Sequence, residues 1–416
     1  MTAETPRLQL APTLGLSRAL TRGTVAKRVV HATVAGMPLR LRYPDGTEVG
    51  GGGPDAPVLE VVRPAALYRR LETHPKIGLG EAYMAGDWRA APGTDLAQAL
   101  MPFAARMGAL VPKPLLSLRG LVDRALPSHQ RNTLAGSRTN ISAHYDLSNE
   151  LFAAFLDPSM SYSSAMFDPH RPLLVQDLHE AQLRKVDAVL DAASVRTGSR
   201  VLEIGTGWGE LAIRAALRGA TVTSVTLSAE QRDLATKRIA EAGVTELVDV
   251  RLQDYREVTG QFDAIVSVEM IEAVGEEYWH TYFQRIDALL APGGAVAIQA
   301  ILMEHHRLMA TRGSFGWIQK YIFPGGLIPS LQSIHEVTRD ATDLRVERVQ
   351  AFGGDYAETL RRWRETFLTQ WPSINSQGFD ETFRRMWEFY LAYCEAGFAT
   401  HYLDVVQIRL SRKDSR

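Results

Sequence analysis

The stretch Val201-Leu202-Glu203-Ile204-Gly205-Thr206-Gly207-Trp208-Gly209 decides the fold of this chain. An apolar strand, residues 200–204, runs directly into a loop with three glycines, and residues 210–217 have the pattern of a helix. The glycines let the backbone take positive φ and approach a ligand closely, while the first turn of a helix offers unpaired N–H groups. The stretch predicts a strand, loop and helix that bind a nucleotide-like ligand, with a plain tight turn as the alternative.

The spacing of the glycines separates this loop from a dinucleotide site. Dinucleotide folds usually show G-x-G-x-x-G and an acidic residue about twenty residues later. Here the third glycine comes one residue early, and the next expected strand ends in Thr226 and Leu227. Glu203, at the end of the first strand, is instead placed to pair with an ammonium group. The loop therefore favours S-adenosylmethionine, whose methionine moiety carries an ammonium, over NAD.

The composition is typical of a globular protein without a metal site. A length of 416 residues is enough for two domains. Cys394 is the single cysteine, so an intramolecular disulfide and a multi-cysteine metal site are excluded, and the 11 histidines show no metal-binding spacing. The chain shows neither a secretory leader pattern nor a long apolar run. We expect a cytoplasmic protein that binds no metal.

Charge is distributed unevenly along the chain. Residues 1–140 hold 18 Lys and Arg against 10 Asp and Glu, a net charge of +8, so the remainder carries −9 within a total of −1. A basic face of this kind fits an anionic partner, either membrane headgroups or nucleic acid. An ordinary solvated surface is the alternative.

Residues 1–130 are predicted to form a smaller α+β domain. Alternating apolar residues from Val29 to Val62, interrupted by turn signals, predict a small antiparallel β unit. Residues 94–126 are amphipathic with interspersed basic side chains, a pattern that can lie on a membrane. The same face would also suit packing on the second domain or a homodimer interface.

Residues 131–416 are predicted to form the catalytic domain. From residue 177 onward helices and strands alternate, which predicts an α/β, doubly wound and mostly parallel sheet with ligands at the carboxyl ends of its strands. The expected elements are helix 177–193, strand 200–204, helix 210–218, strand 221–226, helix 229–241, strands 247–251 and 263–268, helix 276–290 and strand 294–301. Glycines and prolines at 324–329 mark an insertion after the fifth strand.

Three side chains beyond the glycine loop are candidates for nucleoside contacts. Asp254 and Tyr255 end the third strand, where Asp254 would accept from the adenine amino group and Tyr255 would stack on the ring. A cap of the next helix is the alternative role of Asp254. Gln231 lies one turn into a helix that begins at Ser228, and it would reach the ribose hydroxyls.

Two glutamates follow the fourth strand, where this architecture places catalytic groups. Glu269 and Glu272 lie in an otherwise apolar segment, 266–275. Carboxylates are costly in such surroundings unless they are partnered or face a site. We expect them to face the site, with capping of a helix amino terminus as the alternative.

Short motifs follow one another in a fixed order from about Gly80 to Arg409. They are Gly80–Trp88, His144–Asn149, Leu156–Pro158, Tyr162–Ala165, the loop at 205–209, Leu252–Tyr255, Glu269–Gly275, Lys320–Gly326 and Phe352–Tyr356. With these motifs the chain resembles the cyclopropane-fatty-acyl-phospholipid synthases and the related mycolic-acid and tuberculostearic-acid methyltransferases. The resemblance implies a Rossmann-like, class I S-adenosylmethionine-dependent methyltransferase domain, preceded by a smaller α+β lipid-binding domain.

The resemblance also implies the residues of the site. The family motifs that bind the methyl donor fall on Tyr145, Tyr162, Ser163, Gly205, Gly207, Trp208, Thr226, Leu227 and Gln231, to which the reading of the residues adds Glu203, Gly209, Asp254 and Tyr255. The family holds a bicarbonate ion as the base, and the matching positions are Ser164, Glu272, Gln299, Ile301 and Tyr356. Ser164 stands where the family has Cys, and Gln299 stands where it has His. Because a hydroxyl and an amide can both donate hydrogen bonds, the resemblance still implies a bicarbonate ion at this site.

The activity implied by the resemblance is methyl transfer to the double bond of an unsaturated acyl chain in a phospholipid. The product would be a cyclopropane or a methylene- or methyl-branched, tuberculostearic-type fatty acid, the latter with a separate reductase as partner. Such an enzyme would work from the cytoplasm at the inner, anionic face of the membrane, without nucleic acid. Two alternatives stay open: a methyltransferase of a soluble small molecule, and a non-catalytic lipid-binding protein.

Overall fold

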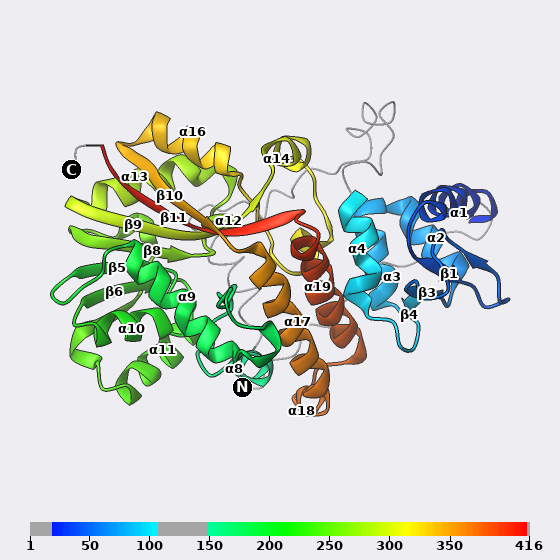
Figure 1. Ribbon diagram of the computed structural model, residues 1–416, viewed down its shortest axis with the longest axis horizontal. Helices are drawn as coiled ribbons and strands as arrows, with labels where there is room; N and C mark the ends of the chain where they lie inside the picture. Colours follow the sequence, from blue (N-terminus) through cyan, green and yellow to red (C-terminus); the bar gives the residue numbers. More distant parts are fainter. Residues whose placement is uncertain (1–18, 107–147, 414–416) are drawn as a thin grey trace. The chain divides into compact units, whose positions relative to one another are not determined.

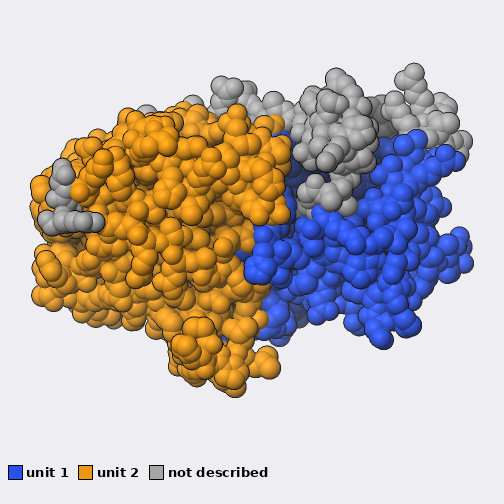
Figure 2. Space-filling model, turned by 45° about the horizontal axis from the view of Figure 1, so that its top comes forward, with its two compact units in different colours: residues 1–125, 314–322, 360–402 blue, residues 126–313, 323–359, 403–416 orange. Residues whose placement is uncertain are grey.

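A computed structural model describes residues 19–106 and 148–413 of the chain, in two compact units. The first unit comprises residues 1–125, 314–322 and 360–402, and the second comprises residues 126–313, 323–359 and 403–416 (Figure 2). The chain therefore returns to the first unit twice after it has entered the second. Two segments from the carboxyl-terminal half, 314–322 and 360–402, pack with the amino-terminal unit.

The first unit combines a small sheet with helices from both ends of the chain. Its strands are β1 Arg40–Arg42, β2 Glu48–Val49, β3 Val58–Val61 and β4 Trp88–Ala90, in the order β2-β1-β3-β4. Its helices are α1 Ala19–Ala35, α2 Pro64–Thr73, α3 Pro75–Met84, α4 Leu96–Arg106, α15 Trp317–Tyr321, α18 Trp371–Ser376 and α19 Glu381–Ala399.

Aromatic rings hold these distant segments of the first unit together. Phe389 of α19 lies 4.9 Å from Trp317 and 5.5 Å from Tyr83, measured between ring centroids. A buried ion pair adds to the contact, because the Arg364 guanidinium donates to Glu395 at 3.0 Å. Burial of such large apolar surfaces explains why residues 360–402 belong to this unit.

The expected antiparallel β unit at 29–62 is wrong in two respects. Residues 29–35 are helical, because α1 extends to Ala35 and buries Val34 completely. Strands β1 and β3 pair in parallel, whereas β1 with β2 and β3 with β4 are antiparallel. Packing of α1 on α2 overrides the β preference of its valines. Of the amphipathic stretch 94–126, the structure describes α4; the rest lies outside the described residues.

The second unit is built on a seven-stranded sheet in the order β10-β11-β9-β8-β5-β6-β7 (Figure 1). The strands are β5 Arg200–Ile204, β6 Thr221–Thr226, β7 Val248–Leu252, β8 Phe262–Val268, β9 Leu290–Met303, β10 Leu344–Ala351 and β11 Leu403–Arg412. Strands β7, β6, β5, β8 and β9 are parallel, and β11 pairs antiparallel with both β9 and β10. The predicted α/β, doubly wound sheet is confirmed.

Helices cover both faces of this sheet. Helices α9 Leu178–Ala192, α10 Glu210–Leu217 and α11 Ala229–Glu241 lie on one face, and α13 Trp279–Leu289 and α16 Leu331–Ala341 lie on the other (Figure 1). Shorter helices are α8 Asn149–Phe155, α12 Ile271–Val274 and α14 His305–Thr311, and α17 Gly353–Thr369 follows β10.

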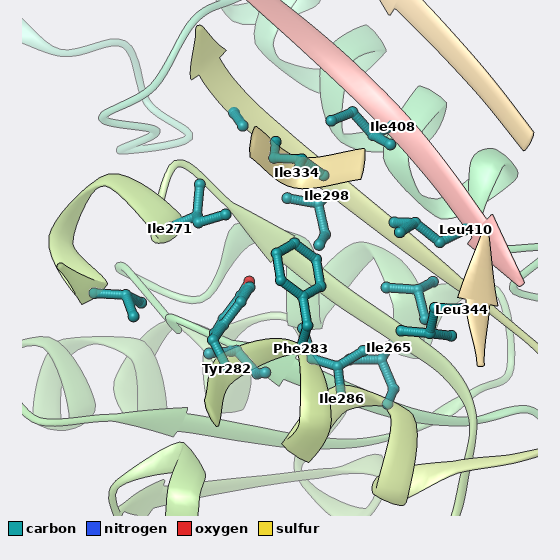
Figure 3. Close-up of a cluster of buried hydrophobic side chains, with 14 of the residues drawn as sticks. Ile265, Ile271, Tyr282, Phe283, Ile286, Ile298, Ile334, Leu344, Ile408 and Leu410 are labelled. Carbon is teal, nitrogen blue, oxygen red and sulfur yellow. The ribbon is translucent and has the colours of Figure 1, made fainter. Parts of the chain in front are cut away.

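Branched aliphatic and aromatic side chains fill the space between the sheet and α13. The labelled members of this cluster in Figure 3 are Ile265, Ile271, Tyr282, Phe283, Ile286, Ile298, Ile334, Leu344, Ile408 and Leu410. All of them are at most 2% exposed. This packing fixes the carboxyl ends of β5, β8 and β9, where the chemistry-bearing residues lie.

Candidate active site

The glycine loop lies at the point where the strand order of the sheet reverses. Strand β5 pairs with β6 along one edge and with β8 along the other. The chain adds β6 and β7 on one side of β5 and then returns to add β8 and β9 on the other side. Open α/β sheets bind ligands at this position, outside the carboxyl ends of the strands. The structure therefore places residues 205–209 where a nucleoside ligand is expected.

All three glycines of the loop have a positive φ. Gly205, Gly207 and Gly209 have φ of +97°, +52° and +92°. A Cβ at Gly205 would come within 2.5 Å of the Met270 side chain, whereas a Cβ at Gly207 would meet no protein atom within 4 Å. Gly207 thus faces open space in front of α10, and this space fits a ligand that contacts the backbone.

Glu203 is a buried carboxyl group at the end of β5. It accepts a hydrogen bond from the Ser224 hydroxyl, which lies 2.7 Å from the Thr206 hydroxyl. Burial raises the pKa of Glu203 to about 8, and the Ser224 hydrogen bond and the Lys185 charge oppose that rise. A nearby ammonium stabilises the ionised form of a buried carboxyl group whose pKa is raised. Glu203 therefore fits the methionine end of the donor.

The predicted ribose contact, Gln231, is hydrogen-bonded inside the chain. The Thr226 hydroxyl donates to Gln231 Oε1 at 2.8 Å, and the Ser228 side chain caps α11 by accepting from the Gln231 N–H. Both Thr226 and Gln231 are buried, and Leu227 between them is half-buried. The three residues lie together at the end of β6. The Gln231 amide nitrogen is still available as a donor.

Asp254 is engaged by its own segment. Both its oxygens accept from the Arg256 guanidinium, at 2.8 and 2.7 Å, and it caps the 3₁₀ turn Tyr255–Glu257 through the Arg256 N–H. The structure thus shows the capping role that the sequence left as the alternative. Tyr255 is half-buried, and its ring lies 5.5 Å from that of Tyr282.

Aromatic side chains join the glycine loop to α8. The Trp208 indole donates to Asn149 Oδ1 at 2.8 Å, and its ring lies 4.9 Å from that of Phe152. The ring of Tyr162 lies 5.1 Å from the same phenylalanine. These contacts bring Trp208 and Tyr162 to one side of the loop, and Tyr145 lies outside the described residues.

The segment Ser163–Phe167 is tied to α17 and α9 by backbone and side-chain hydrogen bonds. The N–H of Ala165 donates to Thr359 at 3.2 Å, and that of Phe167 donates to Asp355 at 2.9 Å. The Lys185 ammonium donates to the Ser163 hydroxyl at 2.6 Å. These bonds hold the segment at the carboxyl end of the sheet.

Lys185 is a functional candidate that the sequence reasoning missed. It is 2% exposed, and burial lowers its pKa to about 8, with the charge of Glu269 as the largest opposing influence. Its signal in the sequence is a lysine on the apolar face of α9, at helical spacing from Ala181 and Val189.

Glu269 receives hydrogen bonds from three separate elements. Gln299 Nε2 on β9 and the Ser164 N–H donate to Glu269 Oε1 at 2.8 and 2.9 Å, and the Tyr356 hydroxyl on α17 donates to Oε2 at 2.8 Å. The residue itself has φ of +52°, and its N–H donates to the Gln299 carbonyl at 2.8 Å. Burial raises the pKa of Glu269, and the three hydrogen bonds and the Lys185 charge oppose that rise.

Glu272, the second predicted carboxylate, is held by β9. Its Oε1 accepts from the Ile301 N–H, and its Oε2 is buried without a hydrogen-bond partner. Burial, followed by the charge of Glu269, raises the pKa of Glu272 to about 8. A buried acceptor without a partner is costly, so Oε2 is an atom at which a ligand charge would be stabilised.

The structure brings the five positions assigned to bicarbonate together, but their donors are directed elsewhere. Gln299 and Tyr356 donate to Glu269, and the Ile301 N–H donates to Glu272. The Ser164 hydroxyl donates to the Ala165 carbonyl at 2.9 Å. A bicarbonate ion added here would meet two carboxyl groups and find these donors engaged, so these residues do not fit a bound bicarbonate.

Two further findings concern the part of the chain that the structure describes. Within residues 19–106 and 148–413, no helix is both long enough and apolar enough to cross a bilayer. In the same residues, no group of three or more His, Cys, Asp or Glu side chains is arranged to hold a metal ion.

The sequence and the structure match a known family. The family described as mycolic acid cyclopropane synthetase matches residues 132–408. Tuberculostearic acid methyltransferase UfaA1 of Mycobacterium tuberculosis is 51% identical over 395 residues, which is 94% of this chain and 91% of that protein. The cyclopropane-fatty-acyl-phospholipid synthase of Escherichia coli K12 is 35% identical over 360 residues, 83% of this chain and 86% of that protein.

Solved structures agree with the sequence relatives. The cyclopropane synthase MmaA2 from Mycobacterium tuberculosis is 28% identical, with a TM-score of 0.61 over 66% of this chain and 98% of the other. The mycolic acid cyclopropane synthase CmaA1, complexed with SAH and CTAB, is 29% identical, with a TM-score of 0.60 over 66% of this chain and 97% of the other. The predicted enzyme class and methyl donor are confirmed. The chain belongs to the cyclopropane synthase family of S-adenosylmethionine-dependent methyltransferases.

Proposed function

We propose that this methyltransferase alkylates the double bond of an unsaturated acyl chain in a phospholipid. The observation that carries the proposal is the pair Glu269 and Glu272, which places two carboxyl groups at the end of β8 and beside the glycine loop. An alkene attacks a methyl group without first losing a proton. The transfer leaves a carbocation on the adjacent carbon. Anionic groups in a desolvated site stabilise that cation.

The donor site supplies the other half of the reaction. Bound S-adenosylmethionine supplies an electrophilic methyl group on its sulfonium. Glu203 would hold the ammonium of the donor, and the backbone at Gly207 would lie against it. The remaining residues would mainly hold the alkene in line with the methyl group, with the reacting atoms about 3 to 3.5 Å apart.

The proposed product is a methylene-branched acyl chain. The relative that is 51% identical is named a tuberculostearic acid methyltransferase, which supports a branch over a ring. A separate reductase would then convert the methylene to a methyl group. The relative in Escherichia coli is named a cyclopropane synthase, so the ring is the second candidate product.

The proposed location is the cytoplasmic face of an anionic membrane. Residues 1–140 carry a net charge of +8. Anionic headgroups attract such a segment and would bring the acyl chain to the enzyme. The protein would associate peripherally.

An assay with defined vesicles tests the function. The purified protein and S-adenosylmethionine carrying a trideuterated methyl group are mixed with vesicles of dioleoylphosphatidylglycerol, with dipalmitoylphosphatidylglycerol vesicles as control. We expect S-adenosylhomocysteine and a labelled acyl chain from the unsaturated lipid alone. Ozonolysis converts a methylene branch to a ketone and leaves a cyclopropane intact. Turnover of soluble acceptors but not of vesicles would contradict the proposal, and failure to bind the donor would point to a non-catalytic lipid-binding protein.

Donor binding should release a proton at Glu203. The pKa of this group is about 8 without ligand, so Glu203 is neutral at pH 7, and pairing with an ammonium requires its ionised form. The affinity for S-adenosylmethionine is therefore expected to rise between about pH 6 and about pH 7.5. Calorimetry in two buffers of different ionisation enthalpy measures the released proton. The variant Glu203→Gln should bind more weakly and release none; equal proton release by both proteins would refute the assignment.

A further inference from the structure

The three hydrogen bonds to Glu269 come from positions that the family resemblance assigned to a separate anion. Gln299, Tyr356 and the segment at Ser164 surround one carboxylate, with donor distances of 2.8 to 2.9 Å. Charge-assisted bonds of this kind are stronger than neutral ones. The side chain of Glu269 thus lies at the point on which these three hydrogen-bond donors converge.

The orientation of the Gln299 amide is fixed from the opposite side. Gln407 of β11 is buried and donates to Gln299 Oε1 at 3.2 Å and to the Lys185 carbonyl at 3.1 Å. Because Oε1 of Gln299 is the acceptor here, its Nε2 must point to Glu269. Strand β11 of the sheet therefore fixes the direction in which the Gln299 amide donates.

The backbone of Glu269 is held in a conformation that side chains seldom adopt. A φ of +52° at a residue other than glycine costs free energy and persists only where the surroundings enforce it. Here the N–H of Glu269 is bonded to the Gln299 carbonyl, and its carboxylate is bonded on both oxygens. This strain directs the carboxylate between β9 and α17 instead of along the sheet.

We propose that Glu269 is the base of the reaction, and that its carboxylate takes the place of the bicarbonate ion. The inference rests on the proposed function. Methyl transfer forms a bond from one alkene carbon to the methyl group, breaks the sulfur–methyl bond and leaves the adjacent carbon positive. Glu269 then takes a proton from the new methyl group.

The fate of the C–H electron pair decides the product. If the pair bonds to the cationic carbon, a cyclopropane closes. If a hydride first shifts from the methyl-bearing carbon to the cation, the pair forms the double bond of a methylene branch. In both cases the acyl chain loses its positive charge and Glu269 becomes a carboxylic acid, which returns its proton to solvent after the product leaves.

The charged groups around Glu269 suit this role. Burial raises the pKa of both glutamates, but Glu269 has three donors and the Lys185 ammonium to stabilise its ionised form. Glu272 has the Ile301 N–H and feels the charge of Glu269, which favours its protonated form. Of the two carboxyl groups, Glu269 is therefore the one that ionises first and can accept a proton.

Two variants test the proposal by the product that they form. Glu269→Gly suits the positive φ and opens space, whereas Glu269→Gln keeps the side-chain size and removes the base. In buffer freed of carbon dioxide, the wild-type protein should work at full rate. Both variants should form methylene or cyclopropane product about 100-fold more slowly, and water should trap part of the cation as a methyl-branched alcohol. Added bicarbonate should restore Glu269→Gly and leave Glu269→Gln unchanged.

A binding measurement keeps the outcome separate from that of the proposed function. Carbon-13 NMR of labelled bicarbonate should show binding to Glu269→Gly and none to the wild-type protein, whatever the lipid substrate is. The exposed Glu277→Gln is the control and should behave as the wild type in every assay. Bicarbonate binding by the wild-type site, a need for bicarbonate in its turnover, or an alcohol as its main product would each overturn the inference. Absence of turnover on all unsaturated vesicles would instead count against the proposed function.

Discussion

Glu272→Gln is expected to lower turnover on unsaturated vesicles about 1000-fold, which is the upper range for loss of one preorganised electrostatic group. The glutamine can still accept from the Ile301 N–H, so the local fold is kept. Its amide, however, replaces the buried and unpartnered Oε2 by a group that cannot become negative. The positive charges of the bound sulfonium and of the carbocation favour ionisation of the Glu272 carboxyl group, whereas the amide stays neutral, so the barrier to methyl transfer rises.

Donor affinity separates this effect from damage to the site. Glu272 is bonded to β9, whereas the glycine loop follows β5, so the dissociation constant of S-adenosylmethionine should change less than about threefold. Calorimetry measures this constant, and release of S-adenosylhomocysteine measures turnover. Glu277→Gln, at an exposed glutamate of the following 3₁₀ turn Glu276–Tyr278, is the matched control. Retained turnover in Glu272→Gln would exclude Glu272 from the chemistry.

Gly207→Ala is expected to weaken the binding of S-adenosylmethionine about 100-fold while leaving the fold intact. The φ of +52° lies in the left-handed region that alanine can enter, and the new Cβ would meet no protein atom within 4 Å. The backbone cost is therefore about 1 kcal/mol. The methyl group would instead occupy space that the donor needs, and loss of a charge-assisted backbone hydrogen bond to the donor costs up to about 3 kcal/mol, which corresponds to about 100-fold in affinity.

A second glycine supplies the control for the backbone cost alone. Gly243 has φ of +72°, and a Cβ there also meets nothing within 4 Å, but it follows α11 far along the chain from the loop. Gly243→Ala should lower the melting temperature as much as Gly207→Ala and leave donor affinity unchanged. Equal donor affinity in the two variants would show that Gly207 does not face the donor.

The sheet domain could be predicted closely because its signals are local. Strand 221–226 and helix 229–241 agree with β6 and α11 at both ends, and strand 263–268 differs from β8 by one residue. β-Branched residues in strand 221–226, an apolar run in strand 263–268 and the Ser228 cap of helix 229–241 determine these elements without help from distant residues. The glycine loop belongs to the same class of local signal.

The first unit could not be predicted in the same way. Val29 and its neighbours have β propensity, yet they lie in α1 because that helix packs on α2. The membership of residues 360–402 depends on contacts such as Phe389 with Trp317. Contacts between residues so far apart in the sequence leave no local periodic signal.

In the site, the sequence indicated residue types but not their partners. Glu272 and Gln299 were identified by motif position, and the structure shows that Gln299 serves Glu269. Asp254 illustrates the opposite case, because the adjacent Arg256 takes both of its oxygens. The amino-acid sequence alone does not show to which of two neighbouring acceptors a side chain will donate.

The position of β11 has a consequence for the biosynthesis of the enzyme. This strand comes last among the described strands, yet it lies inside the sheet, between β9 and β10. Its Gln407 also sets the direction of the Gln299 amide. A nascent chain therefore cannot complete the sheet, or orient the donors around Glu269, until residues 403–412 have left the ribosome. Until then β9 exposes an open edge that other chains could pair with.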